Sequence, residues 1–227
     1  MSTSVWSVGL RAAIIDLDGT MLDTIGDFAV ALNRALVDLK QPPIARAFIE
    51  RTVGKGSEHL IRQTLAEVGA APMLYAPAWM LFQQYYGAVN GDHATVYPGV
   101  LEGLQWFSAR GWKLACLTNK PTEFALPLLR KKGLDGFFSN VFGGDAFESQ
   151  KPDPLPLLRT CEALGSAPAD TLMVGDSSND ARAARAAGCP VVLVSYGYNH
   201  GEPVAAVDAD GVIDRLDQLG TLIAGGT

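Results

Sequence analysis

The segment 14–20 (IIDLDGT) constrains the fold most, because a short apolar run ends in two aspartates one residue apart. The run predicts the end of a buried strand, and Gly19 allows the backbone to turn sharply away from it. Strand alternation would point Asp16 and Asp18 to the same side, where two carboxylates repel each other. A divalent cation between them would relieve this repulsion, and hard oxygen ligands suit Mg²⁺. The alternative interpretation is a strand followed by an Asp-rich turn.

Three further clusters of polar residues each come after an apolar run of strand length. The clusters are 118–121 after the run 113–117, 151–154 in the loop after the run 141–145, and 175–180 after the run 171–174. Residues 181–187 then predict a helix that Gly188 ends. The carboxyl ends of parallel strands form the crevice in which an open α/β sheet binds ligands. We therefore expect the four loops to converge on one site with carboxylates, a hydroxyl, an amide and an ammonium group.

Between the first cluster and the run 113–117 the hydrophobic spacing predicts helices, with no strand in the first part of this interval. Apolar residues recur at helical spacing over 25–39, 60–68 and 78–89. Thr24 is expected at the N-cap of the first helix, and Asp27 lies in its first turn, where an acid is favourable. These apolar stripes predict the packed interior of a small helical bundle rather than a cofactor-binding or membrane-facing surface.

The polar clusters resemble the motifs of a known superfamily. The chain is similar to the haloacid dehalogenase superfamily of phosphotransferases over nearly its full length, in four motifs that keep the family's order: DxDGT at 16–20, TN at 118–119, KP at 151–152, and GD at 175–176 with Asp180. The resemblance implies an α/β fold, with a Rossmann-like core whose mainly parallel sheet is flanked by helices. It also implies a small helical cap inserted after the first strand. The core is expected at 1–20 and 96–227, and the cap at 21–95.

Within that superfamily, four segments resemble the bacterial phosphoglycolate phosphatases: 97–100, 118–121, 151–154 and 195–201. This resemblance implies an Mg²⁺-dependent phosphate monoester hydrolase that forms an aspartyl-phosphate and converts 2-phosphoglycolate to glycolate and phosphate. Two alternatives stay open: another small-molecule phosphatase, for a sugar phosphate, a nucleotide or pyrophosphate, and a phosphomutase of the same superfamily. A haloacid dehalogenase would need neither Mg²⁺ nor Asp18. A catalytically silent regulator is disfavoured by the intact acids and lysine of the motifs.

The resemblance also implies a role for each acid of the motifs. Asp16 would be the nucleophile that attacks phosphorus, and Asp18 would be the general acid and base. The side chains of Asp16 and Asp176 and the backbone carbonyl of Asp18 would bind Mg²⁺. Asp180 would position metal-bound water or Lys151, and its alternative role is that of an ordinary acid in the first turn of a helix.

Phosphate binding is expected from the second and third motifs. The Thr118 hydroxyl and the backbone amide of Asn119 would donate hydrogen bonds to the nonbridging phosphate oxygens. Lys151 would offset charge on both the nucleophile and the phosphate. His200 and Tyr198 receive no catalytic role, because the mechanism already has its acid and its base.

A turn in the expected cap is the candidate for substrate specificity. The segment 51–57 carries Arg51, Gly54, Lys55 and Gly56 immediately before a predicted helix. Phosphoglycolate has a carboxylate close to its phosphoryl group. The free amides of a helix N-terminus, assisted by Lys55 or Arg51, would bind that carboxylate when the cap closes. The alternative is a solvated turn between two helices.

The charge balance is acidic, with 18 lysines and arginines, 24 aspartates and glutamates, and a formal net charge of −6. It argues against nonspecific binding of nucleic acid, so the expected partner is a small phosphorylated metabolite. Cys116, Cys161 and Cys189 lack metal-ligand spacing and indicate reduced thiols, which favours the cytoplasm. The N-terminus predicts neither a signal peptide nor a membrane span. A monomer or a homodimer is expected.

Overall fold

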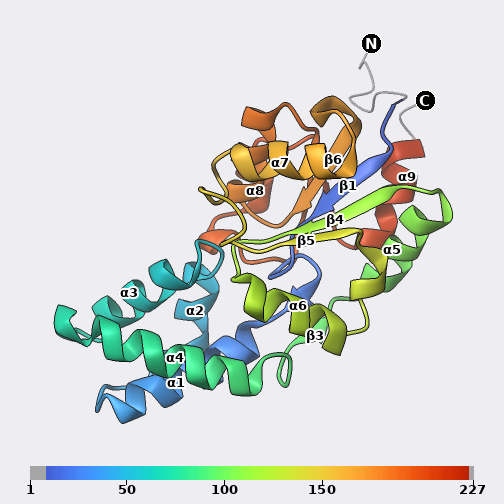
Figure 1. The fold of residues 1–227 in the computed structure, drawn as a ribbon. Coiled ribbons are helices and arrows are strands. Elements are labelled where there is room, and N and C mark those ends of the chain that lie inside the picture. Colours follow the sequence, from blue (N-terminus) through green and yellow to red (C-terminus); the bar gives the residue numbers. More distant parts are fainter. Residues whose placement is uncertain (1–8, 225–227) are drawn as a thin grey trace.

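A six-stranded sheet forms the centre of the computed structural model, which describes residues 9–224 (Figure 1). Its strand order is β5-β4-β1-β6-β7-β8, and all neighbouring strands are parallel. The strands are β1 (Ala12–Ile15), β4 (Lys113–Leu117), β5 (Asn140–Phe142), β6 (Thr171–Gly175), β7 (Val191–Val194) and β8 (Gly211–Ile213). The sheet confirms the predicted α/β class. Residues 1–8, on which the prediction of no signal peptide partly depends, and residues 225–227 lie outside the described part of the chain.

Alternate residues of β1 pack into two hydrophobic layers that cover the sheet. The helices of these layers are α5 (Val100–Ala109), α6 (Thr122–Lys131), α7 (Leu155–Leu164), α8 (Ser178–Ala187) and α9 (Leu219–Ala224). Ala12 and Ile14 belong to the layer with α7 and α8, whereas Ala13 and Ile15 belong to the layer with α5, α6 and α9. All four side chains are fully buried, as is typical of a central parallel strand. The strand therefore delivers the next residue, Asp16, to the middle of the carboxyl edge of the sheet.

Between β1 and β4 the chain forms a second group of helices, which lies beyond that edge (Figure 1). Its elements are β2 (Leu22–Asp23), α1 (Ile25–Asp38), α2 (Arg46–Thr52), α3 (Ser57–Glu67), α4 (Tyr75–Val89) and β3 (Thr95–Val96). The helices share a hydrophobic cluster in which the rings of Phe28, Phe82 and Tyr86 have centroids 4.9, 5.3 and 6.4 Å apart. The strands β2 and β3 pair antiparallel, so the two chain segments that connect the core to the helical group lie side by side. The cap boundaries at 21 and 95 stay a prediction.

The helical spacing predicts three of these four helices. The stripes at 25–39, 60–68 and 78–89 correspond to α1, α3 and α4. The helix α2 is not predicted, because it has seven residues and too few apolar positions to show a period. The expectation of no strand in the first part of this interval is wrong, since β2 lies there and pairs with β3. Each has only two residues, too few for an alternation pattern.

Thr24 and Asp27 occupy the predicted N-cap and first-turn positions of α1, and both also make contacts that the sequence does not predict. Thr24 is at the N-cap but makes no capping hydrogen bond, because its hydroxyl donates to Asp18 Oδ1 at 2.7 Å. Asp27 is fully buried, and its carboxylate accepts hydrogen bonds from the backbone amides of Gly91 and His93, both at 2.7 Å. Thr24 thus ties α1 to the first motif, and Asp27 ties it to the loop after α4.

The short 3₁₀ segments connect these elements. They are η1 (Pro72–Leu74), η2 (Asp135–Phe137), η3 (Pro168–Asp170), η4 (Asn199–Gly201), η5 (Val204–Ala206) and η6 (Leu216–Gln218). Cys116, Cys161 and Cys189 are all buried and form no disulfide, in agreement with their prediction as thiols. Within residues 9–224, each helix is too short or too polar to span a bilayer.

Candidate active site

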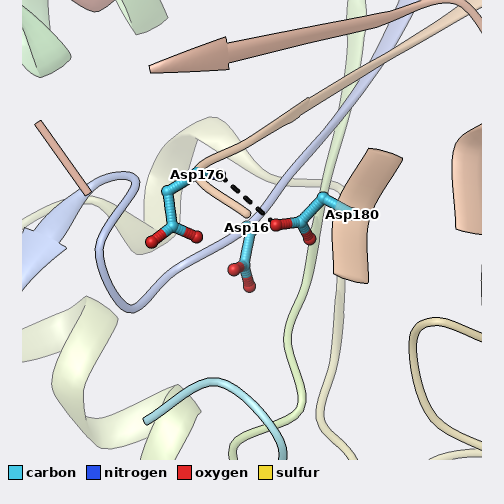
Figure 2. Close-up of side chains that lie close together, drawn as sticks. All are labelled: Asp16, Asp176 and Asp180. Carbon is cyan, nitrogen blue, oxygen red and sulfur yellow. Dashed lines mark hydrogen bonds between the residues drawn. The ribbon is translucent and has the colours of Figure 1, made fainter. Parts of the chain in front are cut away.

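Three buried carboxylates meet where β1 and β6 end. Asp16 directly follows β1, Asp176 directly follows β6, and Asp180 lies in the first turn of α8. One carboxylate oxygen from each lies within 4.8 Å of the others, and Figure 2 shows the three side chains around a common space. The first and fourth motifs therefore come together because their strands are neighbours in the sheet.

Lys151 is the cation that contacts this carboxylate cluster. Its Nζ lies 3.0 Å from Asp16 Oδ1 and 2.7 Å from Asp180 Oδ1, and its side chain is buried. Burial raises the pKa of Asp16 to about 7, although the charge of Lys151 acts in the opposite direction. Burial, together with the charges of Asp180 and Asp16, also raises the pKa of Asp176. Three carboxylates against one ammonium leave excess negative charge, so the residues present fit a hard divalent cation such as Mg²⁺.

Asp180 is more than an acid at the start of a helix. It is 1% exposed, and besides the ion pair with Lys151 its Oδ2 accepts a hydrogen bond from the backbone amide of Asp176 at 3.3 Å (Figure 2). The same oxygen accepts one from the backbone amide of Ser177 at 3.2 Å. The Ser177 hydroxyl donates to the same oxygen at 2.9 Å. Ser177 is the N-cap of α8. Asp180 therefore holds both the loop of the fourth motif and the lysine of the third.

The close packing around Asp176 explains why the first motif has a glycine at position 19. Gly19 has a φ of +82°, and a Cβ at this position would overlap the Asp176 carboxylate. The backbone amide of Tyr198 donates to Asp176 Oδ2 at 2.7 Å. Only glycine combines this backbone conformation with such a close approach.

The Asp18 side chain lies outside the carboxylate cluster. Its Oδ1 and Oδ2 accept hydrogen bonds from Lys120 Nζ at 2.8 and 3.0 Å, and Oδ1 also accepts one from the Thr24 hydroxyl. The negative charges of Asp16 and Asp18 are thus offset by two different lysines. A metal contact through Asp18 would have to come from its backbone carbonyl, which is the contact expected from the resemblance.

Lys120 is a site residue that the sequence does not single out. It is 5% exposed, and its ammonium group lies 4.5 and 4.8 Å from the ring centroids of Phe28 on α1 and Tyr86 on α4. It therefore connects Asp18 to the helical group by an ion pair and two cation–π contacts. The feature of the sequence that could have indicated Lys120 is its position directly after Thr118 and Asn119, inside a segment that resembles the family.

A cavity lies between the motifs and the helical group. It is lined from the core by Asp16, Asp18, Thr118, Asn119 and Lys120, and from the helical group by Phe28, Val53, Gly54, Gly56, Ser57 and Leu60. The predicted nucleophile, acid and phosphate donors thus share one space with two of the four predicted specificity residues.

The other two specificity candidates lie elsewhere. Lys55 is exposed and borders a neighbouring hollow on the outer side of the turn, and Arg51 borders a different hollow beside Tyr198. The structure does not bring either cation into the cavity beside Asp16. His200 lies against this turn with its ring half-buried, and burial and the charge of Lys55 lower its pKa to about 4.

Asn119 links three segments of the site through its side chain. Its Nδ2 donates to the carbonyl of Lys151 at 2.8 Å and to the carbonyl of Gly54 at 3.0 Å, and its Oδ1 accepts a hydrogen bond from the Lys151 amide at 3.1 Å. The Thr118 hydroxyl accepts a hydrogen bond from the amide of Lys120 at 3.2 Å. The amide side chain therefore fixes the third motif against the second.

Comparison with known proteins gives the family to which this fold and this arrangement of acids and lysines belong. The family model described as haloacid dehalogenase-like hydrolase matches residues 13–194, and the chain belongs to this family. It is 43% identical to a phosphoglycolate phosphatase of Thiobacillus denitrificans over 217 residues, 94% of this chain and 96% of the relative. It is 42% identical to one of Nitrosospira multiformis with the same coverage.

A solved structure agrees with this relationship. The crystal structure of a protein from Haemophilus somnus, described as a predicted phosphoglycolate phosphatase, matches with a TM-score of 0.91 at 32% identity. The match covers 95% of this chain and 98% of the other. The protein is therefore an enzyme, a phosphoric monoester hydrolase similar to the phosphoglycolate phosphatases, which confirms the family predicted from the motifs.

Proposed function

We propose that this enzyme hydrolyses 2-phosphoglycolate to glycolate and phosphate in an Mg²⁺-dependent reaction that passes through a phosphorylated Asp16. The observation that carries the proposal is the buried cluster of three carboxylates with one lysine, at the end of the sheet and beside a cavity. The substrate is supported by 43% and 42% identity to proteins named phosphoglycolate phosphatase. The ligand is accordingly a small phosphorylated metabolite.

The charge of the site allows an anionic nucleophile to meet an anionic substrate. Mg²⁺ would be held by Asp16, Asp176 and the backbone carbonyl of Asp18, with Asp180 orienting Lys151 at 2.7 Å. The ion would supply charge neutralisation at the phosphoryl group. Lys151 adds positive charge 3.0 Å from the nucleophile. The Thr118 hydroxyl and the Asn119 amide, both at the cavity, would donate to the phosphoryl oxygens.

The reaction has two steps, and Asp18 acts as the acid in the first step and as the base in the second. A carboxylate oxygen of Asp16 forms a bond to phosphorus while the bond to the leaving oxygen breaks, and Asp18 gives that oxygen its proton. Asp18, now ionised, takes a proton from a water molecule that attacks phosphorus and releases Asp16. The contacts of Asp18 with Lys120 and Thr24 hold the carboxylate in place between the steps.

The side of the cavity facing the helical group would receive the glycolate part of the substrate. Gly56 and Ser57 line it at the N-terminus of α3, where unpaired backbone amides favour an anion. Lys55 lies outside the lining, so we assign the direct contact with the substrate carboxylate to these amides, with Lys55 adding charge from outside. Lys120 supplies a cation within the cavity itself.

A substrate screen tests the proposal. The purified enzyme is assayed with 2-phosphoglycolate, sugar phosphates, nucleotides and pyrophosphate, each with Mg²⁺ and each after metal removal with EDTA. We expect the highest kcat/KM for 2-phosphoglycolate with Mg²⁺ and only background activity in EDTA. A higher kcat/KM for another ester would overturn the substrate and leave the class intact, whereas full activity in EDTA would overturn the Mg²⁺ dependence.

A phosphomutase would use the same motif residues, so the screen includes a second readout. The crystal structure of a putative beta-phosphoglucomutase from Thermotoga maritima matches with a TM-score of 0.75 at 22% identity, a likeness that concerns the fold alone. Release of inorganic phosphate is measured beside isomerisation of sugar phosphates. Hydrolysis without isomerisation is the expected result, and isomerisation would establish the alternative.

A further inference from the structure

One backbone carbonyl of the helical group is held by two core side chains. The turn 53–56, which joins α2 to α3, places the carbonyl oxygen of Gly54 3.0 Å from Asn119 Nδ2 and 3.2 Å from Asn179 Nδ2. Asn119 follows β4 and Asn179 lies in the first turn of α8. The segments that follow two different strands, β4 and β6, therefore converge on the same acceptor at the edge of the cavity.

The two amides depend on this acceptor to different degrees. Asn119 also donates to the carbonyl of Lys151, so it keeps a partner if the turn moves away. For Asn179, Gly54 is the acceptor found within the described residues, and Asn179 as a whole residue is only 4% exposed. A buried amide without an acceptor costs free energy, so this contact favours the arrangement in which the turn rests on the core.

The geometry of Gly54 suits it to this contact. Its φ is +108°, a conformation in which a side chain is strained, and a Cβ there would lie 3.2 Å from His200 Cε1. The same turn supplies Val53 and Gly56 to the lining of the cavity beside Asp16. Movement of the turn away from Asn179 would therefore open this cavity to solvent.

We propose that Asn179 is a positioning residue that docks the turn 53–56 on the core and so closes the cavity over the substrate. Its side chain is directed to Gly54 and is not among the groups that line the cavity. Closure excludes water and completes the binding surface, so docking of the turn should favour turnover. This consequence rests on the proposed function. The docking itself does not depend on which phosphate ester is the substrate.

Limited proteolysis measures the docking directly, without any substrate. Lys55 is exposed on the turn and is a trypsin site. We expect cleavage there to require the turn to leave the core. When opening is fast, the cleavage rate follows the population of the open form. Removal of one buried hydrogen bond by Asn179→Ala should accelerate cleavage after Lys55 by about threefold to tenfold. Asn179→Leu, which keeps the branched shape and the number of side-chain heavy atoms, should do the same.

Two controls separate docking from loss of structure. Asn90→Ala removes a similar contact at the other end of the helical group, where Asn90 Nδ2 donates to the carbonyl of Phe124 at 2.9 Å. It should leave cleavage after Lys55 unchanged. Cleavage after Arg159 on α7, identified by mass spectrometry, reports global unfolding and should be unchanged in every variant. Wild-type cleavage rates after Lys55 in both Asn179 variants, or equal acceleration at Lys55 and Arg159, would overturn the proposal.

Kinetics then give the functional consequence. With the preferred ester of the screen, both Asn179 variants should show a higher KM and a similarly lower kcat/KM, with an unchanged dependence on Mg²⁺. If cleavage after Lys55 is accelerated but KM is unaltered, Asn179 does not help to close the cavity over the substrate. If 2-phosphoglycolate is a poor substrate for the wild type, the proposed function fails while the proteolysis result still decides the docking.

Discussion

The carboxylate of Asp16 must be ionised to attack phosphorus, yet burial raises its pKa to about 7. Asp16→Asn keeps the shape of the side chain but removes the nucleophilic oxygen. Activity should fall by roughly three orders of magnitude or more. Because the amide also removes one charge from a buried cluster, the variant should be at least as stable as the wild type in EDTA.

The measurement for Asp16→Asn is kcat/KM together with the melting temperature in EDTA. Asp208→Asn is the control, because that exposed carboxylate pairs with Arg185 and lies outside the site. Undiminished activity in Asp16→Asn would show that another group attacks phosphorus.

Asp18 should matter differently in the two steps. An aryl phosphate has a leaving group that needs little help from an acid, so Asp18→Asn should still transfer its phosphoryl group to Asp16. Hydrolysis of the phosphoenzyme still needs a base, and its rate should fall by about two to four orders of magnitude. Rapid-quench detection of a hydroxylamine-sensitive phosphoenzyme tests this. A variant that turns over normally and accumulates no phosphoenzyme would remove Asp18 from the mechanism.

At the scale of elements, the loop after β7 connects the carboxylate cluster with the start of the helical group. The Tyr198 hydroxyl donates to Asp23 Oδ1 and accepts a hydrogen bond from the Thr24 amide, both at 2.9 Å. The backbone amide of the same residue holds Asp176. No catalytic role is predicted for Tyr198, because the mechanism already has its acid and its base, and the sequence alone does not indicate the partners of this side chain. Its contacts place it between Asp176 and the connection to α1.

Tyr198→Phe separates the side-chain contacts of Tyr198 from its backbone contact. It removes the hydroxyl and leaves the hydrogen bond between the backbone amide and Asp176. Loss of the contacts at Asp23 and Thr24 should raise KM by about threefold to tenfold, since the connection to α1 is held less firmly. The Mg²⁺ concentration for half-maximal activity should stay within about twofold of the wild type. Steady-state kinetics with a Mg²⁺ titration measure both values. A large change in Mg²⁺ requirement with an unchanged KM would contradict this interpretation.

A helix or strand can be predicted from the sequence when its own residues and the loop that follows it carry a distinctive pattern. The strands β1, β4, β5 and β6 could be predicted because each apolar run ends in a chemically distinctive loop. The strand β7 is equally apolar, but a four-residue run alone does not distinguish a strand from part of a buried helix. The strand β8 has three residues, one of them exposed, and gives no periodic signal.

The candidate site shows the same limit. The four motifs predict which residues meet, because parallel strands bring their carboxyl ends together. The contacts between Lys120 and Asp18 and between Asn179 and Gly54 join residues 102 and 125 positions apart. No local pattern in one sequence indicates which polar side chain crosses such a distance. The missed residues are therefore those that connect the core to the helical group.

At the scale of the whole molecule, the carboxylate cluster links stability to Mg²⁺ and pH. In metal-free protein, the folded-state pKa of Asp16 lies above its value in the unfolded chain, so the unfolded chain alone releases this proton between about pH 4 and 7. The cluster therefore destabilises the metal-free fold increasingly as the pH rises. His200 has the opposite effect through its lowered pKa, but its contribution is the same with and without Mg²⁺ and cancels in the difference.

The prediction is that the rise in melting temperature caused by saturating Mg²⁺ grows as the pH increases from 5 to 8. Protons compete with the ion at low pH and no longer do so at high pH. Thermal unfolding with Mg²⁺ and with EDTA at each pH measures the difference. Asp176→Ala should reduce the Mg²⁺ effect at every pH. A shift that is equal at pH 5 and pH 8 would contradict the placement of the metal.

The ribbon of β2 and β3 has a consequence for the architecture of the chain. Asp23 lies opposite Thr95 in this antiparallel pair, so the chain leaves and re-enters the core at adjacent points. Neither hydrophobic layer of the sheet contains a residue from 25–93 of the described chain. A two-residue turn is the commonest link between strands paired in this way. The helical segment is therefore interchangeable in design: a short hairpin closes the gap that it leaves, and a module of another shape can be grafted onto the same two strands.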